Sequence, residues 1–163
     1  MLTTNFLTHS LSAGLILSTG LAVIMLAGAW YRPELFVDDY PPDVRARYGP
    51  LDPASKRLRG WLGLIFFGWL AGVTLWSIRG IAPVFLPLYT HLFILLQTFN
   101  IVDLLVVDWL IFVAWQPARF ILPGTEGLAG YKNYRFHFRG FLIGLGLITV
   151  MSGILAALIL LFQ

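Results

Sequence analysis

The chain has 163 residues, of which 58% are hydrophobic and 12% are charged, and its formal net charge is +3. Soluble domains carry about 25% charged residues, so this composition indicates a protein whose solvent is lipid. Cysteine is absent, which excludes disulfides, thiol catalysis and thiolate metal sites. The basic residues form neither a groove-reading motif nor a broad basic face, and we therefore expect no nucleic-acid binding.

Four stretches have the roughly 20 mainly apolar residues that a membrane-crossing helix needs. They are Leu11–Tyr31, Leu58–Ile78, Leu88–Trp115 and Phe141–Phe162. We expect an all-α membrane protein in which one domain, residues 1–163, forms a four-helix transmembrane bundle. Small residues at four-residue spacing predict close helix packing, because they let backbones approach in lipid; these are Ser10, Gly14, Ser18, Ala22, Gly68, Gly72, Gly140 and Gly144.

Two polar loops, Arg32–Arg57 and Gln116–Arg139, connect the spans on one side of the membrane. Ten of the eleven Lys and Arg residues lie on this side, and Arg79 alone lies on the other. Basic loops stay in the cytoplasm, so we expect both loops to be cytoplasmic and both termini to be outside, in a bacterial inner or plasma membrane. Within the first loop, residues 42–48 predict a short helical turn. Asp52-Pro53 predicts a helix start, since Asp caps free amides and Pro fits the first turn.

The third span carries the strongest functional signal, a set of polar residues inside the apolar stretch. They are Gln97, Asn100, Asp103 and Asp108. An acid at this depth is costly and indicates either function or a structural pairing. On an α-helix the four residues span an arc of about 140°, with the two acids at opposite edges. We therefore expect no shared-proton pair, and we expect Asp103 to be neutral and hydrogen-bonded to Asn100 or to a hydroxyl group.

Asp108 lies nearer the cytoplasmic end, where the fourth span begins with Tyr134-Arg135-Phe136-His137-Phe138-Arg139. Antiparallel packing predicts an ion pair between Asp108 and Arg139. His137 and Glu126 are candidate neighbours in the same polar site. The alternative is that this aromatic and basic segment simply anchors the chain in the headgroup layer.

The second loop contains closely spaced glycines whose amides could turn toward an anion. We take Gly124, Gly127, Gly130 and Lys132 as a candidate anion loop, although the pattern matches neither of the common phosphate-binding fingerprints. The alternative is a connecting loop that needs glycine at positive φ. His9 and His91 open the first and third spans on the outer side. No short His, Asp or Glu ligand spacing is present, so we expect no metal site and no cofactor.

The segments Asp103-Leu104-Leu105-Val106-Val107-Asp108-Trp109-Leu110-Ile111-Phe112, Pro123–Lys132 and Phe136-His137-Phe138-Arg139-Gly140 resemble an uncharacterised family of bacterial four-span integral membrane proteins. The stretch 38–43 is similar to the first cytoplasmic loop of that family. The resemblance implies the architecture and a bacterial setting, and it implies no catalytic residue.

Three classes of function remain open. The first is the binding or movement of a proton, an ion or a small polar molecule at the intramembrane site, and it predicts a wetted cavity that reaches Asp103. The second is a non-catalytic accessory subunit of a larger membrane complex, with protein partners or a second copy beside the lipid bilayer. It predicts that Asp103 is sealed. The third is an enzyme acting on a lipid headgroup, which predicts a base at an opening at headgroup level.

Overall fold

The computed structural model describes residues 3–162 of the chain. It is 85% helical and contains no strand among these residues. Four of the described helices are long and apolar enough to cross a membrane. The all-α four-helix prediction is confirmed, and the helices extend beyond the apolar stretches. The long helices are α1 (Thr4–Tyr31), α3 (Pro53–Ser77), α4 (Phe85–Val102) continued by the π-helix η3 (Asp103–Trp115), and α5 (Tyr134–Leu161).

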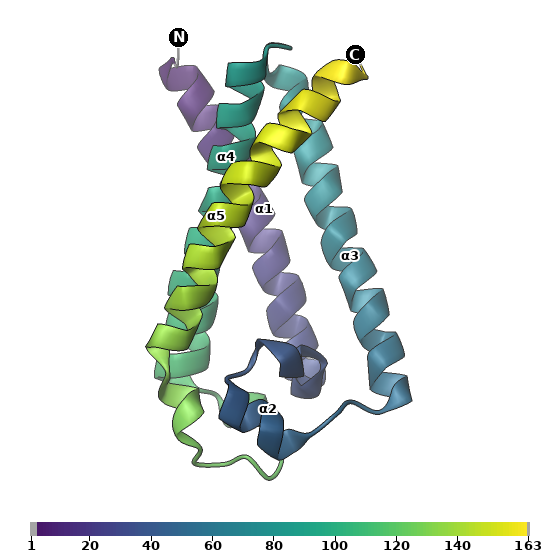
Figure 1. Cartoon of the computed structure of the whole chain (residues 1–163), viewed down its shortest axis with the longest axis vertical. Coiled ribbons are helices and arrows are strands. Elements are labelled where there is room, and N and C mark those ends of the chain that lie inside the picture. The colour runs from purple at the N-terminus through teal and green to yellow at the C-terminus, as the bar shows by residue number, and fades with distance from the viewer. Residues whose placement is uncertain (1–2, 163) are drawn as a thin grey trace.

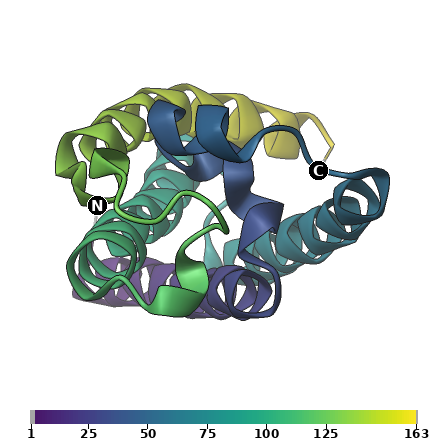
Figure 2. The ribbon, with the colours of Figure 1, turned by 90° about the horizontal axis from the view of Figure 1, so that it is seen from below.

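The helices pack as a four-helix bundle that is open between α3 and α5. Helix α1 packs against both α3 and α4, and α5 packs against α4. Both termini lie at the same end of the long helices, at the top of Figure 1. In the lower half of the figure α3 stands well apart from α5. Figure 2 shows the molecule from below, with α3 on one side and the loop-end part of α5 on another. The bundle is therefore open between α3 and α5 at the end opposite the termini.

Small residues on α1 allow the close packing that the sequence predicts. A Cβ atom added at Gly14 would lie 2.7 Å from Cβ of Thr98, and one added at Gly20 would collide with the ring of Trp69. Ser10 and Ser18 are buried beside them. On α3 the prediction is wrong, because Gly68 and Gly72 have no atom within 4 Å of an added Cβ. Gly140 is likewise open, because these three glycines do not face another helix of the chain.

The two polar loops fold together into a compact layer at the end opposite the termini, which we call the loop layer (residues 32–52 and 116–133). It contains the short helices η1 (Pro33–Asp39), α2 (Pro42–Tyr48), η4 (Ala118–Phe120) and η5 (Ala129–Lys132). Residues of both loops form one apolar cluster, which includes Val44, Leu122 and Tyr131. The hydroxyl of Tyr40 donates to the carbonyl of Phe120 at 2.7 Å. Burial raises the pKa of Tyr40 far above its usual range.

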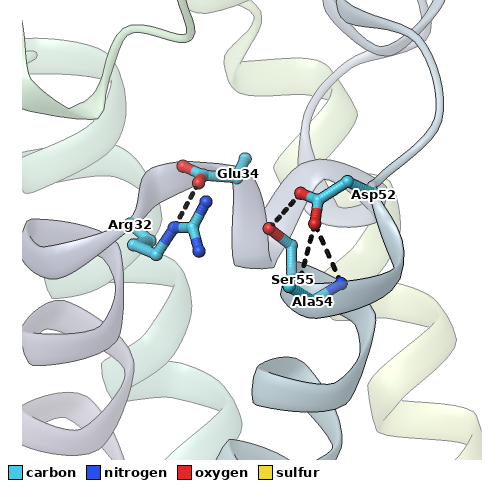
Figure 3. Close-up of polar contacts among 5 residues, drawn as sticks. All are labelled: Arg32, Glu34, Asp52, Ala54 and Ser55. Carbon is cyan, nitrogen blue, oxygen red and sulfur yellow. Dashed lines mark hydrogen bonds and ion pairs between the residues drawn. The ribbon is translucent and has the colours of Figure 1, made fainter.

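The ends of the connections are fixed by local polar contacts (Figure 3). The Asp52 carboxylate accepts the amides of Ala54 at 2.9 Å and Ser55 at 3.1 Å, as the sequence predicts for a helix start. The hydroxyl of Ser55 also donates to it, and these bonds lower the pKa of Asp52. Directly after α1, Arg32 donates to Glu34 at 2.6 Å. This contact lies at the turn between α1 and η1, and η1 packs against α1 and α3.

Candidate functional site

The third span changes its hydrogen-bond register at the first of its two acids. Helix α4 ends at Val102, and a π-helix runs from Asp103 to Trp115. It closes with the amide of Gln116 donating to the carbonyl of Ile111, five residues back, at 2.8 Å. In a π-helix residues five apart lie about one turn apart. Asp103 and Asp108 are five apart and line the same cleft. The arc calculated for an α-helix therefore does not apply to this π-helical segment, which the sequence analysis did not predict.

This cleft has a volume of about 710 Å³ and lies between the loop layer, α3, the third span and α5. We call it the acidic cleft. Its polar lining residues are Asp38, Asp39, Asn100, Asp103, Asp108, His137 and Arg139. Its aromatic lining residues are Phe36, Phe66, Phe99, Phe136 and Phe141. Five of the seven residues that the sequence assigns to the polar site thus meet here, and the other two, Gln97 and Glu126, do not line it.

Asp108 pairs with His137, not with Arg139 as the sequence analysis expects. The imidazole Nδ1 lies 2.9 Å from the carboxylate Oδ1 of Asp108, and both side chains are largely buried. Arg139 is exposed and forms no ion pair with any other residue of the described chain. The two positions differ by two residues on α5, which turns their side chains by about 200° on an α-helix. The position facing Asp108 therefore belongs to the histidine.

Asp103 has a buried oxygen without a partner. No donor in residues 3–162 reaches its Oδ1 atom. The amide of Asn100, its expected partner, donates instead to the carbonyl of Phe141 at 3.2 Å and to Gln97 Oε1 at 3.5 Å. Asn100 thus ties the third span to α5. A buried acceptor without a donor costs about 1–3 kcal/mol, so its persistence points to a group that binds there.

The structure adds Asp39, which the sequence analysis did not select. Helix η1 folds back under the ends of α1 and α3, and its buried residues Leu35 and Val37 fix it there. Asp39, at the end of this turn, points into the cleft. Burial, then the charge of Asp38, and more weakly that of Asp108, raise the pKa of Asp39. The apolar residues Leu35 and Val37 directly before Asp38 and Asp39 could have indicated from the sequence that this segment packs against the helices.

The candidate anion loop lies outside the cleft and is filled by the chain itself. The amide of Gly130 donates to the Asp43 carboxylate at 2.9 Å, and the amide of Gly124 donates to Glu126 at 3.1 Å. Lys132 donates to the carbonyl of Val113 at 2.8 Å. Gly124 and Gly127 have positive φ, so the alternative explanation of a folded connection holds. Glu126 is not a neighbour of Asp103.

The two histidines at the end of the helices that carries the termini also meet. The rings of His9 and His91 stack with centroids 5.4 Å apart. Both nitrogens of His91 contact serine hydroxyls, those of Ser10 at 2.9 Å and Ser77 at 3.0 Å. His9 Nε2 contacts the carbonyl of Ser77 at 2.9 Å. These contacts occupy both nitrogens of His91 and the Nε2 atom of His9, so the histidines join α1, α3 and α4 and leave His91 no atom for a metal.

Comparison with known proteins identifies no relative: no family model, no curated protein and no solved structure matches the chain. The resemblance to a bacterial four-span family therefore stays a prediction. The structure itself offers an acidic cleft lined by Asp103, whose Oδ1 atom has no hydrogen-bond partner among the described residues.

Proposed function

We propose that the protein binds a proton or a cation in the acidic cleft and that it is a membrane binding or transport protein. The observation that carries the proposal is Asp103, which lines a 710 Å³ cleft and whose Oδ1 atom is buried without a partner among the described residues. The transport hypothesis predicts a cavity that reaches this acid, whereas an accessory subunit predicts a sealed one.

The charges of the lining residues favour a positive ligand. Arg59 pairs with Asp38, and His137 pairs with Asp108. Asp39 and Asp103 have no such partner among the described residues, and exposed Arg139 is the remaining cation of the lining. An uncompensated carboxylate in a site of low dielectric either takes up a proton or attracts a cation.

The distribution of basic residues supports an orientation with the loop layer in the cytoplasm and both termini outside. In this orientation the acidic cleft lies at the cytoplasmic end of the spans. The setting that we propose is a bacterial inner membrane.

Infrared difference spectroscopy on the protein in lipid nanodiscs tests the proposal. We expect a pH step to change a protonated-carboxyl band that disappears in Asp103→Asn and persists in the control Glu126→Gln, because Glu126 lies outside the cleft. If no carboxyl band assigned to Asp103 or Asp39 responds to pH or to added cations, the proposal is wrong.

The Asp108–His137 pair favours hydrolysis at a lipid headgroup as a second candidate. A histidine held by a carboxylate is a common general base, and Arg139 could meet a phosphate at the same opening. The cleft lining contains no Ser, Thr or Cys, so the nucleophile would be water. Release of a headgroup from nanodisc lipids by the wild-type protein, and its loss in His137→Gln, would favour this candidate over cation binding.

Protein partners stay a third proposal, because the exposed glycines of α3 would admit another helix. Native purification from the source membrane tests this. A partner that co-purifies in stoichiometric amount with the wild-type protein, and no longer with Gly68→Leu, would favour the accessory-subunit function.

A further inference from the structure

We infer that the ligand of the acidic cleft is an organic cation with an apolar body, which reaches the acids from the bilayer through the open side between α3 and α5. This inference rests on the proposed function and specifies its ligand. It is carried by the shape of the cleft, the order of polar and apolar groups along it, and its size.

The opening faces the membrane. Helix α5 packs on α4 and α3 packs on α1, and Figure 1 shows α3 and α5 well apart at the loop-layer end. Phe66 from α3 and Ile143 from α5 line the cleft at this gap. Ile143 is 62% exposed on an apolar helix. A ligand that enters here passes through hydrocarbon, and it must carry enough apolar surface to be soluble there.

The acids, His137 and Arg139 line the cleft together with Phe36 and Phe136 toward the loop layer, and further phenylalanines continue the lining away from it. His137 and Asp108 lie near the loop layer, whereas Ile143 is six residues further along α5, about 9 Å deeper. Phe99 precedes Asp103 by four residues and Phe141 follows His137 by four, so both lie further from the loop layer on their helices, and Phe66 of α3 lines the same cleft. Aromatic faces attract cations as well as apolar groups. A positive head near the acids and an apolar body among the phenylalanines satisfy both parts.

The size of the cleft distinguishes an organic cation from an inorganic ion. Its volume of about 710 Å³ falls within the 300–1,000 Å³ typical of small-molecule sites, whereas a water molecule takes about 30 Å³. A dehydrated metal ion also needs several ligands converging on one point. In residues 3–162 no three His, Asp or Glu side chains are placed in this way. The acids are distributed along a wall, as a bulky cation requires.

Equilibrium dialysis of tetraphenylphosphonium against the purified protein in nanodiscs tests the inference. The control ligand is tetraphenylborate, which has the same shape and the opposite charge. We expect saturable binding of the cation only. Asp103→Asn and Asp39→Asn should each weaken it about tenfold, since a charge contact worth about 1.4 kcal/mol corresponds to that factor. Glu126→Gln should leave it unchanged.

A matched pair on α3 tests the aromatic part. Phe66 lines the cleft, whereas its neighbour Phe67 is 64% exposed on the outer face. Phe66→Leu should weaken tetraphenylphosphonium binding by about 3- to 30-fold through the lost cation–π contact, and Phe67→Leu should not.

The outcomes separate this inference from the proposed function. If tetraphenylphosphonium does not bind, or binds no better than tetraphenylborate and equally well to Asp103→Asn, the inference is overturned. If the infrared band of Asp103 nevertheless responds to pH or to inorganic cations, the proposed function stands without it. If neither response is seen, both are wrong.

Discussion

The surroundings of Asp39 disfavour its charged form. Burial and the charges of Asp38 and Asp108 raise its pKa above the ordinary value of 3.8. The folded protein therefore holds the proton more tightly than the unfolded chain. The stability from this protonation is fully present below the unfolded pKa and is lost as the pH rises through the folded pKa.

We therefore expect Asp39→Asn to stabilise the protein near neutral pH and to flatten its pH dependence. The side chain is partly exposed to the cleft, so solvent screening keeps the gain below about 1 kcal/mol. Thermal unfolding in detergent between about pH 4 and pH 8 measures it. Parallel pH profiles for the wild type and the variant would show that Asp39 carries no such cost. A variant such as Asp39→Asn that gains stability and loses ligand binding shows the usual trade-off at a functional site.

The identity of the site residues could be predicted from the sequence more readily than their partners. Intramembrane acids are so costly that composition alone indicates Asp103 and Asp108. The partner of Asp108 depends on which of two nearby positions on α5 faces it. A difference of two residues along α5 decides between His137 and Arg139, and hydropathy does not encode which of them faces Asp108. Asp39 lies in a loop, where acids are common and therefore carry no signal.

At the scale of elements, apolar length predicts the four spans because the bilayer thickness fixes it. The Asp52-Pro53 start and the helix at Pro42–Tyr48 were also predictable from local backbone chemistry. The π-helix was not, because its hydrogen bonds shift by one residue while its residues remain ordinary helix formers. The loop layer was missed for a different reason. The aromatic residues of the loops, such as Tyr40 and Tyr131, pack against each other, whereas aromatic residues flanking spans usually indicate membrane anchoring.

The contrast between α1 and α3 gives a prediction at the same scale. Gly14→Ala should destabilise the protein by about 1–3 kcal/mol, because its new methyl group would overlap Thr98 on α4. Gly68→Ala is the matched control. Its methyl group meets no atom within 4 Å, and alanine is the better helix former, so its effect should lie between zero and a gain of about 1 kcal/mol. Unfolding in a denaturing detergent measures both. Equal losses for the two variants would contradict the arrangement of helices described above.

At the scale of the whole molecule, the loop layer and the open side work together. The layer joins the two loops through one apolar cluster and covers the acidic cleft at one end. Phe66 of α3 and Ile143 of α5 both line this cleft, and these two helices do not pack against each other as the other neighbouring helices do. In the proposed function a ligand therefore reaches the acids along apolar side chains, and the loop layer holds Asp38 and Asp39 in place. Because α3 is fixed mainly through α1, it is also the helix whose movement would widen or close that route.

The orientation of this assembly in the membrane is the remaining whole-molecule prediction. The chain has no cysteine, so single cysteines can report on each end. Lys56 is exposed at the loop-layer end of α3, and Ala82 is exposed in the turn at the termini end. An impermeant maleimide added to intact cells should label Ala82→Cys and spare Lys56→Cys until the membrane is opened. The physical reason is that ten basic residues at the loop-layer end resist translocation, against Arg79 at the other. Labelling of Lys56→Cys in intact cells would invert the topology and place the acidic cleft on the outer side, where it would meet ligands arriving from outside.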